Sequence, residues 1–126
     1  MLRRKRLILI GVFIFSVTSS ILFIRGKYNV PILMYHSINP ASNPYMELLI
    51  VSPDIFERQM HFLKEHNYNV ISLSEVAGMI KNKKKIPPKT VVITFDDGYK
   101  DNYTYAFPIL KKYNLPATIF IIVNEV

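Results

Sequence analysis

The sequence predicts an α/β fold: the N-terminal half of a distorted (β/α) barrel with parallel strands, preceded by an N-terminal transmembrane helix. Two observations favour this fold. Short apolar, β-branched segments alternate with helical patterns along residues 28–123, which is typical of parallel strands joined by helical crossovers. An uncharged segment also follows a basic N-terminus. A complete barrel needs roughly 200 residues or more, so the 100 residues of Lys27–Val126 are expected to form about half of one.

The N-terminus carries a membrane-topology signal. Met1–Arg6 is a basic tail expected in the cytoplasm, and Leu7–Ile24 contains 18 residues without a charge. A helix of that length spans about 27 Å, close to the hydrocarbon thickness of a bilayer. The positive-inside rule then places residues 25–126 outside the cell, as the globular domain of a single-pass cell-membrane protein.

A cleaved signal peptide and secretion are the alternative to this anchor. The apolar part of a signal peptide is usually shorter, and its small residues stand at the cleavage site. Here the small residues Ser16 to Ser20 lie within the apolar segment, with four large apolar residues after them. A buried helix of a soluble domain is disfavoured by the Arg/Lys block directly before the segment.

The net charge of +7 comes mostly from this topology signal. Residues 1–25 contribute +5 and residues 26–126 contribute +2. Nucleic-acid binding therefore does not follow from the basicity, and no nucleic-acid partner is expected. The absence of cysteine excludes disulfides, thiolate metal sites and a lipidated cysteine.

Four strands and three helices are expected in alternation. The first strand takes about five residues within Tyr28–His36, and Ser37–Ile50 is expected to be a loop. The other strands are predicted over residues 70–73, 90–95 and 117–123, the last two buried on both faces. The helices are predicted over residues 53–66, around Val76, Met79 and Ile80, and over residues 101–113.

Local signals indicate where the helices begin. Ser52 with Pro53 fits an N-cap followed by proline at the first helical position. Ser72 and Glu75 have the spacing of a capping box. Pro108 lies inside the third helix and predicts an irregular first half.

Two adjacent carboxylates, Asp96 and Asp97, end the strand predicted over residues 90–95 and precede Gly98. Burying unpaired, mutually repelling carboxylates is costly, so this pattern is typical of a strand that delivers charge to a site, often a metal site. His36 ends the first strand in the same way, and ligands of α/β sheets bind at the carboxyl ends of strands. An Asp-Gly turn stabilised by side-chain bonding and a structural role for His36 are the alternatives.

The segment Thr94-Phe95-Asp96-Asp97-Gly98-Tyr99 resembles the first motif of the polysaccharide deacetylases (carbohydrate esterase family 4, the chitooligosaccharide deacetylase homology domain). The following Ala106-Phe107-Pro108-Ile109-Leu110 and Leu115-Pro116-Ala117-Thr118-Ile119-Phe120 are similar to the next part of that family. The opening Pro31-Ile32-Leu33-Met34-Tyr35-His36 resembles its cell-surface branch, which includes the poly-N-acetylglucosamine deacetylases. The resemblance covers residues 30–124 and implies a hydrolase of N-acetyl groups on cell-surface or extracellular polysaccharide.

The resemblance also implies roles for the two carboxylates. Asp96 would be the general base that activates a water, and Asp97 would be a ligand of the divalent metal, zinc or a similar ion. His36 and Tyr99 are expected to line the site. Tyr99, like the other nearby tyrosines, either stacks on a sugar ring or simply packs.

The family completes its metal site with a His-x-x-x-His pair that this sequence lacks. The three histidines are His36, His61 and His66, and the last two are expected on a helix surface. We therefore expect metal binding to be weak or absent, because catalytic zinc normally takes three protein ligands. The chain is expected to be a truncated, inactive deacetylase or a split piece of one; the alternative is an anchored, non-catalytic module that binds a glycan or a partner.

Overall fold

The structure is a computed structural model that describes residues 6, 9–20, 30–40 and 47–123. Residues 9–20 form a helix whose apolar side chains are exposed, including Phe13. Within the described ranges, no helix is both long and apolar enough to cross a membrane. The predicted segment Leu7–Ile24 falls partly outside the described residues, at 7–8 and 21–24.

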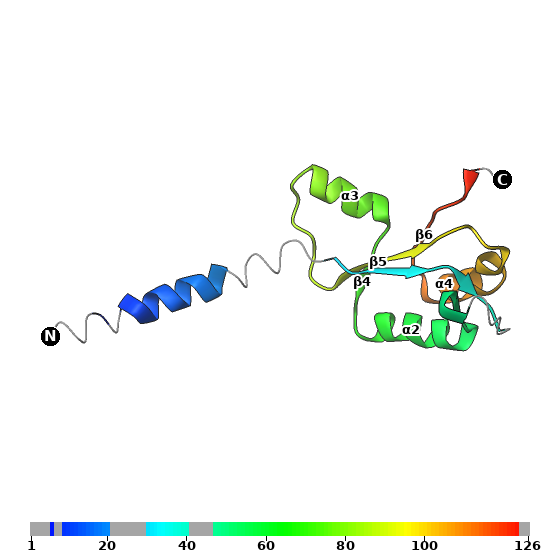
Figure 1. Cartoon of the computed structure of the whole chain (residues 1–126), viewed down its shortest axis with the longest axis horizontal. Helices are drawn as coiled ribbons and strands as arrows, with labels where there is room; N and C mark the ends of the chain where they lie inside the picture. Colours follow the sequence, from blue (N-terminus) through cyan, green and yellow to red (C-terminus); the bar gives the residue numbers. More distant parts are fainter. Residues whose placement is uncertain (1–5, 7–8, 21–29, 41–46, 124–126) are drawn as a thin grey trace.

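The main sheet contains four parallel strands, and its central strand is β5 (Thr90–Phe95). Strand β1 (Ile32–Tyr35) pairs with one edge of β5, in a register that places Tyr35 beside Phe95. On the other edge, β4 (Asn69–Val70) pairs with the beginning of β5 and β6 (Thr118–Ile119) with its end. The parallel α/β architecture predicted from the sequence is confirmed (Figure 1).

Helices cover both faces of this sheet (Figure 1). On one face lie α2 (Pro53–Glu65), the π-helical turn η2 (Asn102–Ala106) and α4 (Phe107–Tyr113). On the other face lies α3 (Leu73–Lys81). All residues of β5 are buried, as expected for a strand enclosed on both faces.

The larger core cluster joins β5 to α2, η2 and α4. Tyr35, Phe56 and Phe95 form its centre, with ring centroids 5.0, 5.6 and 5.8 Å apart in edge-on and stacked arrangements. The Tyr35 hydroxyl donates a hydrogen bond to Oε1 of Gln59 at 2.8 Å. Burial raises the pKa of Tyr35 to about 12, which keeps the phenol neutral and able to donate.

The smaller cluster packs α3 against the opposite face of β5. It consists of Val76, Ile86 and Val92, with Val30 and Met79 packed around it. This cluster covers only the beginning of β5. Toward the end of the strands Met34 remains exposed, so this face of the sheet is partly open.

The predicted helix starts are confirmed. Ser52 Oγ accepts a hydrogen bond from Ile55 N, and both bonds of the capping box between Ser72 and Glu75 are present. The third helix begins with η2 before the regular turns of α4, so the irregularity expected from Pro108 is also present.

Three strand predictions need correction. The segment 37–50 is not only loop, because β2 (Ser37–Ile38) pairs in parallel with β3 (Ile50–Val51), and η1 (Glu47–Leu49) precedes β3. The second predicted strand is paired only at its start, where β4 meets Thr90 and Val91. The predicted strand over residues 117–123 is paired only at β6, and its apolar residues from Ile119 onward are exposed instead of buried.

We expect Phe56→Ala to lower the free energy of unfolding by about 3–5 kcal/mol, because it leaves a cavity at the centre of the larger cluster. Phe62→Ala on the same helix is the matched control, since Phe62 is half exposed and should cost no more than about 1 kcal/mol. Urea denaturation of the full chain measures both. Equal losses would show that Phe56 does not hold α2 on the sheet.

Candidate active site

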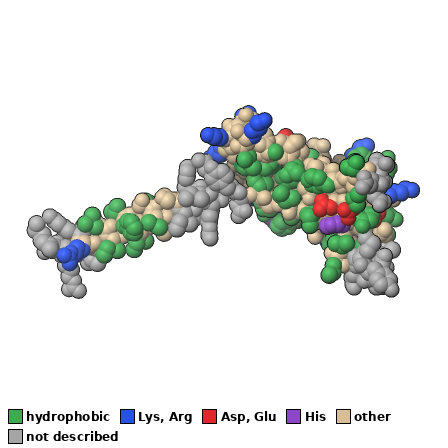
Figure 2. All heavy atoms as spheres, turned by 45° about the horizontal axis from the view of Figure 1, so that its top comes forward, with side chains coloured by type: hydrophobic (Ala, Val, Ile, Leu, Met, Phe, Trp, Pro, Cys, Tyr) green, Lys and Arg blue, Asp and Glu red, His purple; other side chains and the backbone are tan. Residues whose placement is uncertain are grey.

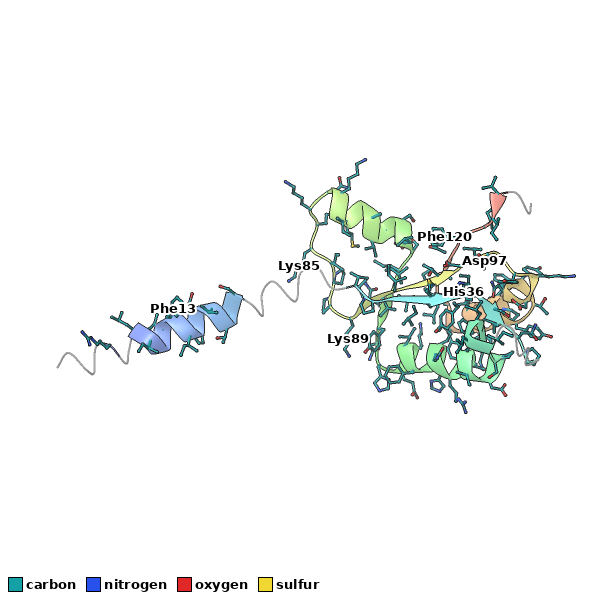
Figure 3. The ribbon with its side chains drawn as sticks, viewed as in Figure 1. Phe13, His36, Lys85, Lys89, Asp97 and Phe120 are labelled. Carbon is teal, nitrogen blue, oxygen red and sulfur yellow. The ribbon has the colours of Figure 1, made fainter. Side chains whose placement is uncertain are left out.

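The two candidate strand ends lie side by side. Asp96 follows β5 and His36 follows β1, and the backbone N–H of Asp96 donates to the carbonyl of Tyr35 at 2.9 Å. This bond continues the pairing of the two strands by one residue. Figure 2 shows acidic side chains next to a histidine on this face, and Figure 3 shows His36 and Asp97 at the same end of the sheet.

A tight turn follows Asp96. Asp97 and Gly98 both have left-handed backbone angles, with φ of 68° and 69°. Aspartate tolerates this region better than most residues, and glycine adopts it freely. A Cβ on Gly98 would stand 3.0 Å from Cγ2 of Ile121. The motif therefore needs glycine both for its φ and for the close approach of the segment after β6.

The carboxylates stand at the rim of an apolar cavity of about 490 Å³. Asp96 is half-buried and Asp97 is exposed. The cavity lies on the open face of the sheet and is lined by Ile32, Met34, Leu73, Thr94, Asp96, Asp97, Phe120, Ile121 and Ile122. Asp96 is thus placed between water and an apolar wall, while the Asp97 side chain is open to solvent.

A hydrogen-bond network that we did not predict fixes the turn after β1. Nδ2 of Asn102 donates to the carbonyl of His36 at 2.9 Å, and the hydroxyl of Ser37 donates to Oδ2 of Asp101 at 2.6 Å. Nδ2 of Asn39 also points to Oδ2 of Asp101, at 3.4 Å. The helical segment that follows the Asp-Asp-Gly motif therefore positions the backbone of His36.

Two acceptors in this network have no hydrogen-bond partner among the described residues. They are Oδ1 of Asp101 and Oδ1 of Asn102, both buried. Buried acceptors usually have a donor. Asn102 is only 4 % exposed, which is unusual for asparagine. The network is therefore part of the protein interior.

The predicted residues His36 and Tyr99, and the other two histidines, are not among the residues that line the cavity beside the carboxylates. Tyr99 is half-buried and lines a separate cavity of about 540 Å³, with Tyr103, Phe107 and Leu115 among its walls. His61 and His66 are exposed at the end of α2, where His61 lies 3.5 Å from Glu65 and His66 stacks on Phe62. They stand on the helix surface, as expected.

The described residues do not form a complete metal site. No group of three or more histidine, cysteine, aspartate or glutamate side chains gathers closely enough within the described ranges to hold an ion. Asp96 and Asp97 supply oxygen ligands, but three protein ligands are normal for catalytic zinc. The donor set described here accounts for only part of such a site.

The segment that carries the carboxylates matches a known family. Residues 83–126 match the sequence profile of polysaccharide deacetylase. A protein of Bacillus subtilis named as a polysaccharide deacetylase, YxkH, is 45% identical over 93 residues, covering 74% of this chain and 32% of its own length. The poly-β-1,6-N-acetyl-D-glucosamine N-deacetylase of Staphylococcus epidermidis is 36% identical over 105 residues, covering 75% of this chain and 36% of its own length.

The chain belongs to the polysaccharide deacetylase family. The deacetylase PplD of Streptococcus pyogenes, solved in complex with acetate, superposes on 76% of this chain and 43% of its own length, with 39% identity and a TM-score of 0.67. IcaB from Ammonifex degensii has 30% identity and a TM-score of 0.69, over 80% of this chain and 41% of its own length. This deacetylase-family chain thus spans about a third of the curated relatives it matches.

We expect Asn102→Ala in this family member to lower the free energy of unfolding by about 1–3 kcal/mol, because the carbonyl of His36 loses its donor. Amide exchange of Ser37 and Ile38 should also become faster than in the wild type. Thr104→Ala is the control, since its hydroxyl bonds the carbonyl of Lys100 in an exposed position of the same segment. Unchanged exchange at Ser37 in Asn102→Ala would contradict the positioning role.

Proposed function

We propose that this chain supplies part of a metal-dependent deacetylase that hydrolyses N-acetyl groups on cell-surface or extracellular polysaccharide containing N-acetylglucosamine. The observation that carries the proposal is the end of β5. There Asp96 and Asp97 stand at the rim of a cavity, beside His36, within the segment that matches the deacetylase profile. The names of the staphylococcal relatives support the substrate class.

The surroundings of the two carboxylates support different roles. Asp96 is half-buried and its backbone is fixed by the carbonyl of Tyr35, which suits a general base that takes a proton from water in a constant position. Asp97 is exposed at the left-handed turn, which suits an oxygen ligand of zinc or a similar divalent ion. Neighbouring carboxylates in different environments commonly divide such tasks.

The substrate would approach from the open side of the sheet. The cavity there offers mainly apolar walls to a bound sugar, with the carboxylates at its rim. His36 follows β1, whose residues Ile32 and Met34 line the cavity. Tyr99 lines the neighbouring cavity, where it could stack on a further sugar ring of the same polysaccharide.

A membrane anchor for this domain is also part of the proposal. We propose that Leu7–Ile24 holds the protein in the cell membrane, with Met1–Arg6 inside and residues 25–126 outside. The basic residues before the apolar segment and the exposed apolar side chains of residues 9–20 support this topology. Secretion after signal cleavage is the alternative.

We expect the 126-residue chain to bind Zn²⁺ more weakly than micromolar, because the described residues do not assemble three ligands. Calorimetric titration of the full chain and of Asp97→Ala measures this. Tight one-to-one binding by the wild type that disappears in Asp97→Ala would show that the chain completes the site by itself.

The catalytic proposal is tested in a chimera in which residues 30–123 replace the matching segment of the Staphylococcus epidermidis deacetylase. We expect the chimera to release acetate from poly-β-1,6-N-acetyl-D-glucosamine. Asp96→Asn should lower kcat/KM by about 10²–10⁴-fold, the usual contribution of a positioned general base. Asp54→Asn, at an exposed position of the first turn of α2, should leave the activity unchanged.

The chimera also distinguishes the second candidate function, an anchored module that binds glycan or a partner without catalysis. The incomplete donor set among the described residues favours that candidate. A folded chimera that binds the polysaccharide but releases no acetate would support the binding module and contradict the enzyme.

A further inference from the structure

Four exposed lysines form a basic surface at the end of α3 and in the turn that leads to β5. We call Lys81, Lys83, Lys84 and Lys85 the basal lysines. No acidic residue occurs in the sequence from Val76 to Phe95. Both ion pairs found in the described part of the chain lie elsewhere, on α2 and between α2 and α4. The charge of the basal lysines is therefore directed toward solvent.

The basal lysines project from an ordered turn. The backbone N–H of Lys83 donates to the carbonyl of Ile80 at 3.1 Å, and that of Lys84 donates to the carbonyl of Met79 at 2.9 Å. Nδ2 of Asn82 bonds the carbonyl of Gly78 at 2.8 Å. Lys89 does not belong to this surface, because its ammonium donates to the carbonyl of His66 at 2.9 Å.

This basic surface and the carboxylates lie at opposite ends of the sheet. The basal lysines precede β5, whereas Asp96 and Asp97 follow it. Because β1 runs parallel to β5 and pairs with it up to Phe95, these positions correspond to the amino and carboxyl ends of both strands. Figure 3 shows Lys85 and Lys89 at one end and His36 and Asp97 at the other.

The chain enters the domain at the lysine end. Val30 packs in the same cluster as Ile86, and the carbonyl of Pro31 accepts a hydrogen bond from Val92 N at 3.0 Å. Nine residues lie between the end of the helix over residues 9–20 and Val30. Even a fully extended connection spans at most about 35 Å, so the apolar helix is tethered within that distance of the entry point.

We propose that the basal lysines contact the anionic headgroups of the membrane that holds the N-terminal helix. The proposal rests on the anchoring proposed above. Basic residues close to an apolar membrane segment are attracted by anionic lipid, and two such signals together hold a domain on a surface much better than one. The lysine end would face the bilayer and the carboxylate end would face away from it.

The tether favours lipid over a soluble anionic polymer as the partner. Because Val30 is tied within about 35 Å of the apolar helix, the lysine end of the domain meets headgroups at a high effective concentration without a separate binding event. The electrostatic attraction acts only within a Debye length, about 10 Å at moderate salt. It therefore selects lysines at the entry end and leaves those near the carboxylates unaffected.

The test is lysine labelling of the full chain in nanodiscs of phosphatidylcholine, with or without phosphatidylglycerol. The rate of acetylation of each lysine by an amine-reactive reagent is measured by mass spectrometry. We expect phosphatidylglycerol to slow labelling of the basal lysines about fivefold, the factor equivalent to ~1 kcal/mol of attraction per lysine. Lys100 and Lys111, which are exposed elsewhere, are internal controls and should react at unchanged rates.

The outcomes separate this proposal from the anchor. A chain that stays with both kinds of nanodisc but whose basal lysines react equally in each has an anchor and no lysine contact, which overturns the proposal. A chain that stays with neither overturns both. Protection by soluble polyglycerol phosphate as strong as that by phosphatidylglycerol would assign the surface to an anionic polymer instead.

A matched pair of variants gives an independent readout. Lys83→Gln with Lys84→Gln should remove the protection of Lys81 and Lys85, and should weaken the dependence of nanodisc binding on phosphatidylglycerol. Lys100→Gln with Lys111→Gln removes the same charge from another surface and should change neither. Equal effects of the two pairs would indicate net charge alone and would contradict a specific basic surface.

Discussion

The rest of the structure depends on the burial of β5. This strand is enclosed by α2, η2 and α4 on one face and by α3 on the other, and it pairs along both edges. Its residues are therefore apolar or small up to Phe95. The following carboxylate would cost several kcal/mol if it entered the same environment unpaired. The position of the core thus determines where the charged residues begin.

This constraint also fixes the register of β1. The side chains of Tyr35 and Phe95 both belong to the larger aromatic cluster, so a shift by one residue would turn the wrong face of β1 toward α2. The same register places His36 next to Asp96. Asn102 and Asp101 then hold the turn after β1 against the segment that follows the motif. The site combines two distant parts of the chain, the end of β1 and the segment after β5. Core packing sets their register, and polar contacts hold the turn after β1 in place.

The sequence could predict the features that depend on neighbouring residues, but not those that depend on contacts between distant parts of the chain. Helix starts at Ser52 and Ser72 and the end of β5 at Asp96 depend on neighbouring residues, so local patterns located them. The extents of β4 and β6 depend on which residues find a partner strand, and the apolar composition of residues 117–123 could not show that pairing stops after Ile119. The bond between Ser37 and Asp101 joins residues 64 apart, and the only signal for it was the pair of polar residues at the start of the third helix.

A parallel sheet also gives the molecule two chemically different ends. β1 and β5 end together where Asp96 and Asp97 lie, and the chain enters β1 at Val30, which packs beside the beginning of β5. The turn that precedes a strand is therefore far from the site, and it can carry charge without disturbing the carboxylates. The basal lysines occupy such a turn. In an antiparallel sheet, the residues that follow successive strands would lie at opposite ends of the sheet. The separation between the lysine end, which faces the membrane in our proposal, and the carboxylate end, which faces the substrate, therefore follows from the parallel direction of the strands.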